Sequence, residues 1–291
     1  MKIHEGLLKI DRRIIYAVLF LVVTLPLIFP SVLKVRPMTP VEKLFDAVDQ
    51  TPDDMAIILD ISYAPQIKAE VEPMAIAVLR HAFKTRKKVL VLSLYVEMIG
   101  LATRALNQVV AEFNANAATR EDSIIYGRDY VFLGWQPPPI VPMLGMGESI
   151  SGIYVVDYYG NETDTLEIMR QIENYGNISI LVALSGSSIP ISWVAYAQNR
   201  YGLKVGVGCT AVSGADFYPY YQTGQFTGLM VGMKGAAEYE ELVETTHGVK
   251  GRRMASEAML SLTFAHLIII AFILIGNIGF FLQRRKNARV D

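Results

Sequence analysis

The chain has 291 residues, of which 52% are hydrophobic and 19% are charged, and its mean hydropathy is +0.31. This composition is more apolar and less charged than that of an average soluble protein. A net charge of −1 without a basic arm argues against a nucleic-acid partner, and the single cysteine, Cys209, excludes a disulfide within the chain.

The first predicted element is a hydrophobic segment from Ile14 to Leu33 that contains no Asp, Glu, Lys or Arg. A bilayer core needs about twenty apolar residues per helical span, so this segment is long enough to cross it. It ends in prolines rather than in an A-x-A-like cleavage site, which favours an uncleaved signal anchor over a cleaved signal peptide. Residues 1–13 then form a short basic head, and residues 34–40, with two prolines, form a stiff stalk.

Between the stalk and residue 250 the pattern predicts one α/β domain, residues 41–250. Short apolar runs typical of buried strands are followed by longer stretches of helical periodicity. Strands are predicted at 55–61, 87–93, 129–134, 178–184 and 204–209. Helices are predicted at 41–49, 70–85, 100–114, 166–175 and 190–201, with helical material over 217–243. This alternation indicates a Rossmann-like, mainly parallel sheet of about five strands flanked by helices.

A second hydrophobic segment, Ala258–Leu282, also lacks Asp, Glu, Lys and Arg and is followed by a basic tail, residues 283–291. A buried core helix is the alternative, but the length and the basic flank favour a second transmembrane helix. His266 inside it is expected to be a neutral histidine near the membrane interface rather than a proton relay. Basic residues are more numerous in the two tails than in the flanks that face the domain, so we expect cytoplasmic termini and an extracytoplasmic domain.

The carboxyl ends of the predicted strands should form the ligand-binding edge of the sheet. At the most informative end, residues 184–190 (Leu-Ser-Gly-Ser-Ser-Ile-Pro) pass from a strand through hydroxyl residues into a helix. Backbone N–H groups and the helix dipole would favour a carboxylate or phosphate there, although ordinary helix capping is the alternative. The predicted ligand-binding residues are Asp60, Ser185, Gly186, Ser187, Ser188, Thr210, Ser213 and Asp216.

A serine hydrolase is the enzymatic alternative. Ser187 or Ser188, followed in the chain by Asp216 and His247, has the order found in α/β-hydrolases, but a proline replaces the last glycine of G-x-S-x-G. A serine–lysine dyad could instead use Lys204 or Lys234, although no spacing singles out such a pair. We therefore expect a protein without catalytic activity and leave the hydrolase as the rival.

No metal site and no cofactor are expected. The four histidines are scattered, Cys209 is alone, and no cluster has the spacing of metal ligands. Cys209 at a strand end is interpreted as an inert buried thiol. There is no G-x-G-x-x-G dinucleotide motif and no Walker A loop.

Gly228, Gly232 and Gly235 are predicted to lie on one helix, where small residues allow close approach of another helix. Tight packing against the sheet is one interpretation, and a subunit interface in a homo-oligomer is the other. A third possibility for the whole chain is a structural subunit of a larger membrane complex, in which the spans and this helix make the contacts.

Several segments resemble an uncharacterised family of prokaryotic membrane proteins anchored by a transmembrane helix at each end. These are residues 129–135, 144–148 (Leu-Gly-Met-Gly-Glu), 208–212 (Gly-Cys-Thr-Ala-Val), 216–220 (Asp-Phe-Tyr-Pro-Tyr) and 224–240. The resemblance extends over nearly the whole chain and implies the architecture, but no activity or residue role. Members of the family have Tyr-Lys-x-Gly-Gly after the third strand, where this chain has Trp135-Gln-Pro-Pro-Pro139.

The sequence thus predicts a membrane-tethered α/β domain, outside the cytoplasm, that binds a small anionic ligand or a protein partner and forms oligomers. The lipid bilayer is the other expected partner.

Overall fold

The computed structural model describes residues 11–29, 34–249 and 251–287. Its centre is a six-stranded, all-parallel sheet with the strand order β3-β2-β1-β4-β5-β6. The strands are β1 (Ala56–Ile61), β2 (Lys88–Leu92), β3 (Tyr130–Gly134), β4 (Ile178–Leu184), β5 (Val205–Cys209) and β6 (Phe226–Val231). The prediction of a parallel α/β sheet is confirmed, with one strand more than expected.

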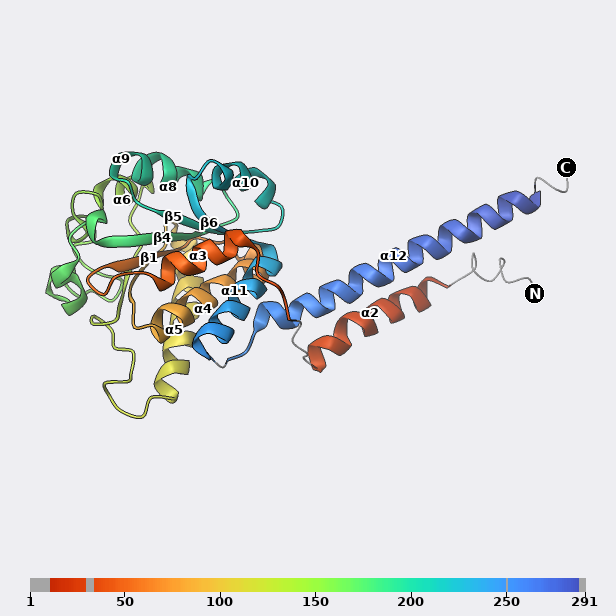
Figure 1. The fold of residues 1–291 in the computed structure, drawn as a ribbon, viewed down its shortest axis with the longest axis horizontal. Helices are drawn as coiled ribbons and strands as arrows, with labels where there is room; N and C mark the ends of the chain where they lie inside the picture. The colour runs from red at the N-terminus through yellow and green to blue at the C-terminus, as the bar shows by residue number, and fades with distance from the viewer. Residues whose placement is uncertain (1–10, 30–33, 250, 288–291) are drawn as a thin grey trace. The chain divides into compact units, whose positions relative to one another are not determined.

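Helices cover both faces of this sheet (Figure 1). One face is covered by α3 (Thr39–Asp49), α4 (Lys68–Lys84), α5 (Ile99–Ala115) and α11 (Gly232–His247). The other is covered by α6 (Ile140–Gly145), α7 (Ile150–Ile153), α8 (Ile189–Trp193), α9 (Asn199–Tyr201) and α10 (Gly214–Gln222). The central strands are buried on both faces, as their continuous apolar runs predict.

The sixth strand corrects the prediction of one glycine-bearing helix over 217–243. Residues 226–231 form β6, which pairs in parallel with β5, and only Gly232 and Gly235 lie on the following helix, α11. Gly224, with φ +78°, lies in the tight turn between α10 and this strand. Glycines at spacings of three and four residues suggested a helix here, whereas the β-branched and aromatic residues at the ends of β6 fit a strand.

Leu44 on α3 explains why the last two strands contain glycine. Gly206 of β5 and Gly228 of β6 are paired across the ladder. A Cβ atom on Gly228 would lie 2.5 Å from the Leu44 backbone nitrogen, and one on Gly206 would lie 2.2 Å from a Leu44 methyl group. The two glycines therefore provide the space that lets α3 pack directly on the sheet.

The long connection between β3 and β4 is ordered rather than a plain loop. It contains α6, α7 and three short 3-10 helices, Thr163–Thr165, Glu167–Gln171 and Tyr175–Asn177. The helix predicted over 166–175 is thus only a short 3-10 segment there. The helix predicted at 190–201 is present as α8 and α9 joined by a π-helical turn, Val194–Gln198.

The terminal segments form a separate unit, and the α/β domain comprises Lys34–Ala255. The C-terminal helix α12 (Met254–Asn287) includes 29 residues, Met254–Leu282, that are long and apolar enough to cross a membrane and are largely exposed. Among the described residues no N-terminal helix meets this standard: α2 (Arg12–Ile28) has 17 residues, or about 26 Å of helix. Residues 30–33 of the predicted first span, most of the basic head (1–10), Lys250 and the end of the tail (288–291) lie outside the described residues.

The segment that leads into α12 is fastened to the α/β domain. Arg253 forms ion pairs with Glu241 and Glu244 of α11 at 2.6 and 3.0 Å. The carbonyl oxygen of Arg252 accepts a hydrogen bond from Arg80 at 2.8 Å. Residues 252 and 253 are therefore part of the packed α/β domain.

Candidate ligand-binding site at the carboxyl edge of the sheet

The strand order reverses between β1 and β4, which lie side by side at the centre of the sheet. From β1 the chain continues outward to β2 and β3, whereas from β4 it continues the other way to β5 and β6. Helices that leave neighbouring strands in opposite directions open a crevice at the carboxyl ends of those strands. Asp60 and Ser185 lie at the ends of the two strands that border this point.

Asp60 is fully buried, and both of its carboxyl oxygens accept hydrogen bonds. The Ser62 hydroxyl donates to Oδ1, and Trp193 Nε1 donates to Oδ2 at 2.7 Å. The Ser62 hydroxyl oxygen also accepts the N–H of Leu94 at 2.9 Å, which connects β1 to the end of β2. Burial raises the pKa of Asp60 to about 7, although both hydrogen bonds lower it. Asp60 therefore stabilises the centre of this edge from within and does not line an open surface.

The hydroxyl residues at the ends of β4 and β5 bind to one another. Ser185 and Ser187 are joined through their hydroxyls at 3.0 Å, and Thr210 and Ser213 are joined likewise at 3.0 Å. The Ser213 hydroxyl also donates to the carbonyl of Gly186 at 3.2 Å, so the two turns form one group.

Ser188 and Asp216 stand apart from that group. Both side chains are exposed, Ser188 at the start of α8 and Asp216 on α10. Ser188 occupies the N-cap position of α8 but makes no side-chain capping hydrogen bond. Ordinary capping by this serine is therefore not observed.

A cavity of about 520 Å³ opens at the same edge, beside the end of β3. Its lining residues are mainly apolar and aromatic, with Gln136 and Asp157 as the polar ones among the described residues. None of the described residues that line it is a Lys, Arg or His. The lining residues are Val96, Ile99, Leu133, Gly134, Trp135, Gln136, Ile153, Tyr154, Val155, Val156, Asp157 and Tyr158.

Two tyrosine hydroxyls at this edge are buried without a hydrogen-bond partner. Tyr154 lines the cavity with only 3% of its surface exposed, and Tyr63 follows β1 with none exposed. A buried hydroxyl without a partner costs about 1–3 kcal/mol, so native proteins rarely keep one. The Tyr154 hydroxyl has no accessible surface and lies within electrostatic range of Asp60, so it belongs to the core rather than to the open cavity.

Asp157 forms the acidic end of the cavity and is already fully engaged. Its carboxylate accepts hydrogen bonds from the Tyr126 hydroxyl, from the side-chain amide of Asn161 at 2.9 Å and from the N–H of Tyr159 at 2.8 Å. Burial raises the pKa of Asp157, but these hydrogen bonds outweigh it and hold the pKa below its ordinary value. The negative charge disfavours an anion inside the cavity.

The serine-hydrolase arrangement is not formed in the described structure. His247 lies at the opposite, amino edge of the sheet, with Nε2 2.7 Å from Asp49 Oδ1, whereas Ser187 and Ser188 follow β4 at the carboxyl edge. Lys204 precedes β5 and so also lies at the amino edge. Lys234 forms an ion pair with Glu238 at 2.5 Å.

Cys209 is fully buried at the end of β5. Burial raises the pKa of its thiol to about 12, so the nucleophilic thiolate is not formed near neutral pH. The structure thus agrees with an inert thiol.

The three glycines assigned to a subunit interface pack against neighbours within the domain. A Cβ atom on Gly235 would lie 2.9 Å from the backbone of Met230, and one on Gly232 would lie 3.0 Å from Ala211. With Gly228 beneath Leu44, all three provide close approach inside the α/β domain. Oligomer formation through them stays a prediction from the sequence.

Sequence reasoning missed Trp193 and Tyr154. Trp193 lies 133 residues after the carboxylate that it binds, and Tyr154 lies in the connection of irregular sequence. For Tyr154, the only signal was the general rule that long ordered loops tend to be functional.

No family model matches the chain, and comparisons with curated proteins and with solved structures find no match. The resemblance to a family of doubly anchored prokaryotic membrane proteins therefore stays a prediction.

Proposed function

We propose that this protein is a membrane-tethered α/β domain that binds a small ligand in the cavity at the carboxyl edge of its sheet. The main supporting observation is a cavity of about 520 Å³ at this edge, whose lining is mostly apolar and aromatic and includes Gln136 and Asp157 as polar residues. Pockets for small molecules have this character: mostly apolar walls with a few placed polar groups.

The lining favours a ligand with an apolar or aromatic body and one neutral polar group. The described lining contains no basic side chain, and Asp157 is held ionised. Burial of a carboxylate or phosphate there would cost free energy without a compensating positive charge. If the ligand is anionic, as the sequence suggested, its charge would have to lie outside the cavity, for example at the turn that contains Ser187 and Ser188.

Neutral aromatic probes test the cavity directly. We expect indole or p-cresol to raise the unfolding temperature of the full-length protein in detergent, and benzoate to do so less. A ligand at a hundred times its Kd adds about 2.7 kcal/mol to the free energy of unfolding. The fluorescence of Trp135, which lines the cavity, should change with the same midpoint.

Two variants separate the cavity from general partition into detergent. Gln136→Leu removes the neutral polar side chain of the lining and should weaken p-cresol binding by about tenfold, the equivalent of one lost hydrogen bond of about 1.4 kcal/mol. Gln222→Leu, at the exposed end of α10, is the matched control and should bind as the wild type does. Equal affinities in all three proteins would contradict the proposed site.

The tether is supported by α12, whose first 29 residues have the length and composition of a membrane span. The first span and the extracytoplasmic side of the domain rest on the sequence alone. Because Cys209 is the only cysteine, Cys209→Ser with Asp216→Cys gives one exposed thiol. Labelling of intact cells by a membrane-impermeant maleimide is expected; labelling only after lysis would place the domain in the cytoplasm.

A further inference from the structure

Three helices of the α/β domain end together at the amino edge of the sheet, opposite the cavity described above. Asp49 is the last residue of α3, His81 lies in the last turn of α4, and His247 is the last residue of α11. One donor atom from each of these side chains lies within 4.8 Å of the other two. Residues separated by 32 and 166 positions in the chain thus meet at one point.

The donor atoms are arranged around a single carboxylate oxygen. His81 Nε2 is 3.0 Å from Asp49 Oδ1, and His247 Nε2 is 2.7 Å from the same atom. The second contact is outside hydrogen-bond geometry, so the buried Nε2 of His247 has no hydrogen-bond partner. A buried nitrogen that faces a carboxylate without a hydrogen bond is unusual, and a shared cation would resolve it.

The surrounding side chains fix the orientation of His81 as metal sites usually require. The Tyr239 hydroxyl lies 2.9 Å from His81 Nδ1, which leaves Nε2 to face Asp49. Phe45 stacks on the His81 ring with centroids 4.2 Å apart and also lies against the His247 ring at 5.7 Å. A partner on the second ring nitrogen is the typical outer contact of a metal-binding histidine.

The local electrostatics favour a cation at this point. Each of the three helices directs the negative end of its dipole toward the cluster. The positive charge of Lys87 acts against a cation here, but Lys87 is paired with Asp53, because its Nζ lies 3.3 Å from Asp53 Oδ1.

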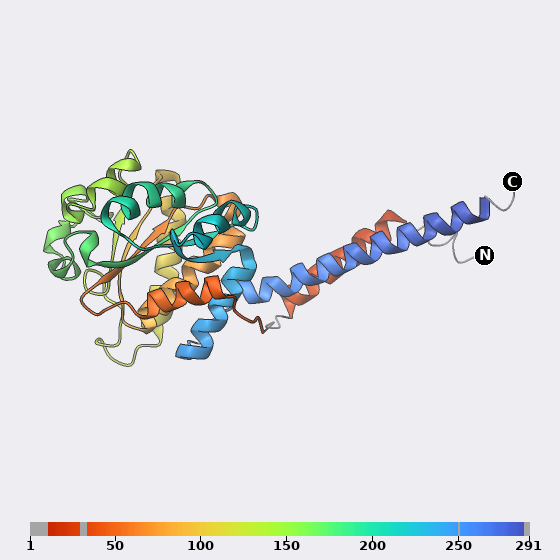
Figure 2. The same ribbon diagram turned by 45° about the horizontal axis from the view of Figure 1, so that its top comes forward.

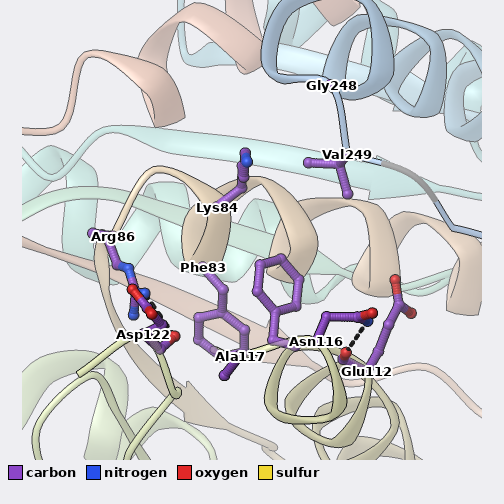
Figure 3. Close-up of a pocket in the computed structure, with 10 residues that line it drawn as sticks. Phe83, Lys84, Arg86, Glu112, Asn116, Ala117, Asp122, Gly248 and Val249 are labelled. Atoms are coloured by element: carbon purple, nitrogen blue, oxygen red, sulfur yellow. Dashed lines mark hydrogen bonds between the residues drawn. The ribbon is translucent and has the colours of Figure 1, made fainter. Parts of the chain in front are cut away.

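A cavity of about 470 Å³ is lined by residues from the ends of α4 and α5 and from the segment after α11, and none of the three donor residues lines it (Figure 3). Gly248, directly after His247, and Lys84, one helical turn after His81, are among its lining residues. Phe83 contributes an apolar wall, while Arg86 donates to the carbonyl oxygen of Asp122 at 2.6 Å.

We propose that Asp49 Oδ1, His81 Nε2 and His247 Nε2 together bind one divalent first-row transition metal ion such as Zn²⁺, with a further position left for water. Two imidazole nitrogens and one carboxylate oxygen suit zinc and its neighbours, whereas calcium and magnesium prefer oxygen ligands throughout. This site is separate from the cavity at the carboxyl edge and does not depend on it.

The test is metal binding by the full-length protein in detergent after treatment with a chelator. Zn²⁺ alone is titrated by calorimetry, and Co²⁺ is used as a spectroscopic probe of the ligand geometry. We expect one ion per chain, a rise in unfolding temperature and a visible Co²⁺ absorption that excess Zn²⁺ removes. Absence of stoichiometric binding by the wild type would overturn the proposal.

Matched variants assign the ligands. Asp49→Asn and His247→Gln should weaken Zn²⁺ binding by more than about a hundredfold, because loss of an outer contact alone costs about 10–100-fold. Tyr239→Phe keeps all three ligands and the buried ring, and should weaken binding by that smaller factor. If the ligand variants do not fold, Tyr239→Phe still tests whether this cluster binds the metal.

Asp53→Asn and His266→Gln are the controls. The first removes an exposed carboxylate near the cluster, and the second removes a histidine from α12. Both should bind Zn²⁺ as the wild type does. Two results would contradict the site. One is unchanged Zn²⁺ binding in Asp49→Asn, His247→Gln and Tyr239→Phe, and the other is an equal loss of binding in the controls.

Discussion

The two edges of the sheet use their polar side chains differently. At the carboxyl edge, Asp60 accepts from Ser62 and Trp193, and the Ser and Thr residues at the ends of β4 and β5 bind one another. Among the described residues, two buried tyrosine hydroxyls there have no partner. At the amino edge, imidazole nitrogens and a carboxylate from three helix ends converge. The comparison shows that the rule locating ligands at the carboxyl ends of parallel strands does not identify every candidate site in such a domain.

The largest expected effect is at the centre of the carboxyl edge. Trp193→Ala removes a fully buried indole and should lower the free energy of unfolding by about 3–5 kcal/mol. Trp193→Phe keeps most of the ring but leaves Asp60 Oδ2 without its donor, and should cost about 1–3 kcal/mol. Chemical denaturation of the two variants measures the free energy of unfolding that each substitution removes. Equal decreases in the two variants would mean that packing of the indole ring contributes little to stability.

The second prediction concerns pH and Asp60. Its pKa is raised from 3.8 to about 7 in the folded protein, so between about pH 4 and pH 7 the folded state retains a proton that the unfolded chain has lost. The Asp60 contribution to the free energy of unfolding should therefore fall as pH rises through this window, by at most about 1.4 kcal/mol per pH unit. His81 acts in the opposite direction, because burial lowers its pKa from 6.5 to about 4 and the unfolded chain then holds the extra proton over much of the same window. The Asp60 contribution is therefore the difference between the profiles of the wild type and Asp60→Asn, with Asp216→Asn, at an exposed position, as the control. A wild-type profile that does not fall relative to that of Asp60→Asn would contradict the prediction.

The third prediction makes the same substitution at both edges. Without metal, Tyr239→Phe removes the partner of the buried His81 Nδ1 and should lower the free energy of unfolding by about 1–3 kcal/mol. Tyr154→Phe removes a hydroxyl that has no partner, and should be neutral or raise that free energy slightly. Thermal unfolding of the two variants shows the sign. A clear loss in Tyr154→Phe would reveal a partner for this hydroxyl.

The smallest effect is expected at the serine turn. Ser188→Ala should change the free energy of unfolding by less than about 0.5 kcal/mol, because this side chain is exposed and makes no capping hydrogen bond. A capping serine would cost about 1 kcal/mol when replaced. The difference is large enough to be resolved by denaturant titration, and a cost of about 1 kcal/mol would add Ser188 to the capping by Ser187, whose hydroxyl oxygen accepts the N–H of Ile189 at 3.5 Å.

Much of the fold followed from periodicity. The apolar runs at residues 55–61, 87–93, 129–134, 178–184 and 204–209 are strands, because strands covered on both faces lack alternating polar residues. β6 was missed because its glycine spacing resembled a helix-packing motif, and the reason for Gly228 is a tertiary contact with Leu44. Contacts of that kind leave no local signal in one sequence.

The candidate sites were less predictable. Asp60, Ser185 and Thr210 lie at one edge, as their places at strand ends predicted, but the sequence could not show that Asp60 would bind Trp193, Ser185 would bind Ser187 and Thr210 would bind Ser213. The cluster of Asp49, His81 and His247 was invisible, since metal-ligand motifs are recognised by short spacings and these residues come from three helices.

The close approach of α3 to the sheet places a joint constraint on three positions. Leu44 fills the space left by Gly206 and Gly228, and these glycines face each other in the parallel ladder. A side chain at either glycine would force the helix outward unless position 44 became smaller. In an alignment of homologous chains, residues 44, 206 and 228 should therefore covary, with a larger residue in β5 or β6 accompanied by alanine or glycine in α3.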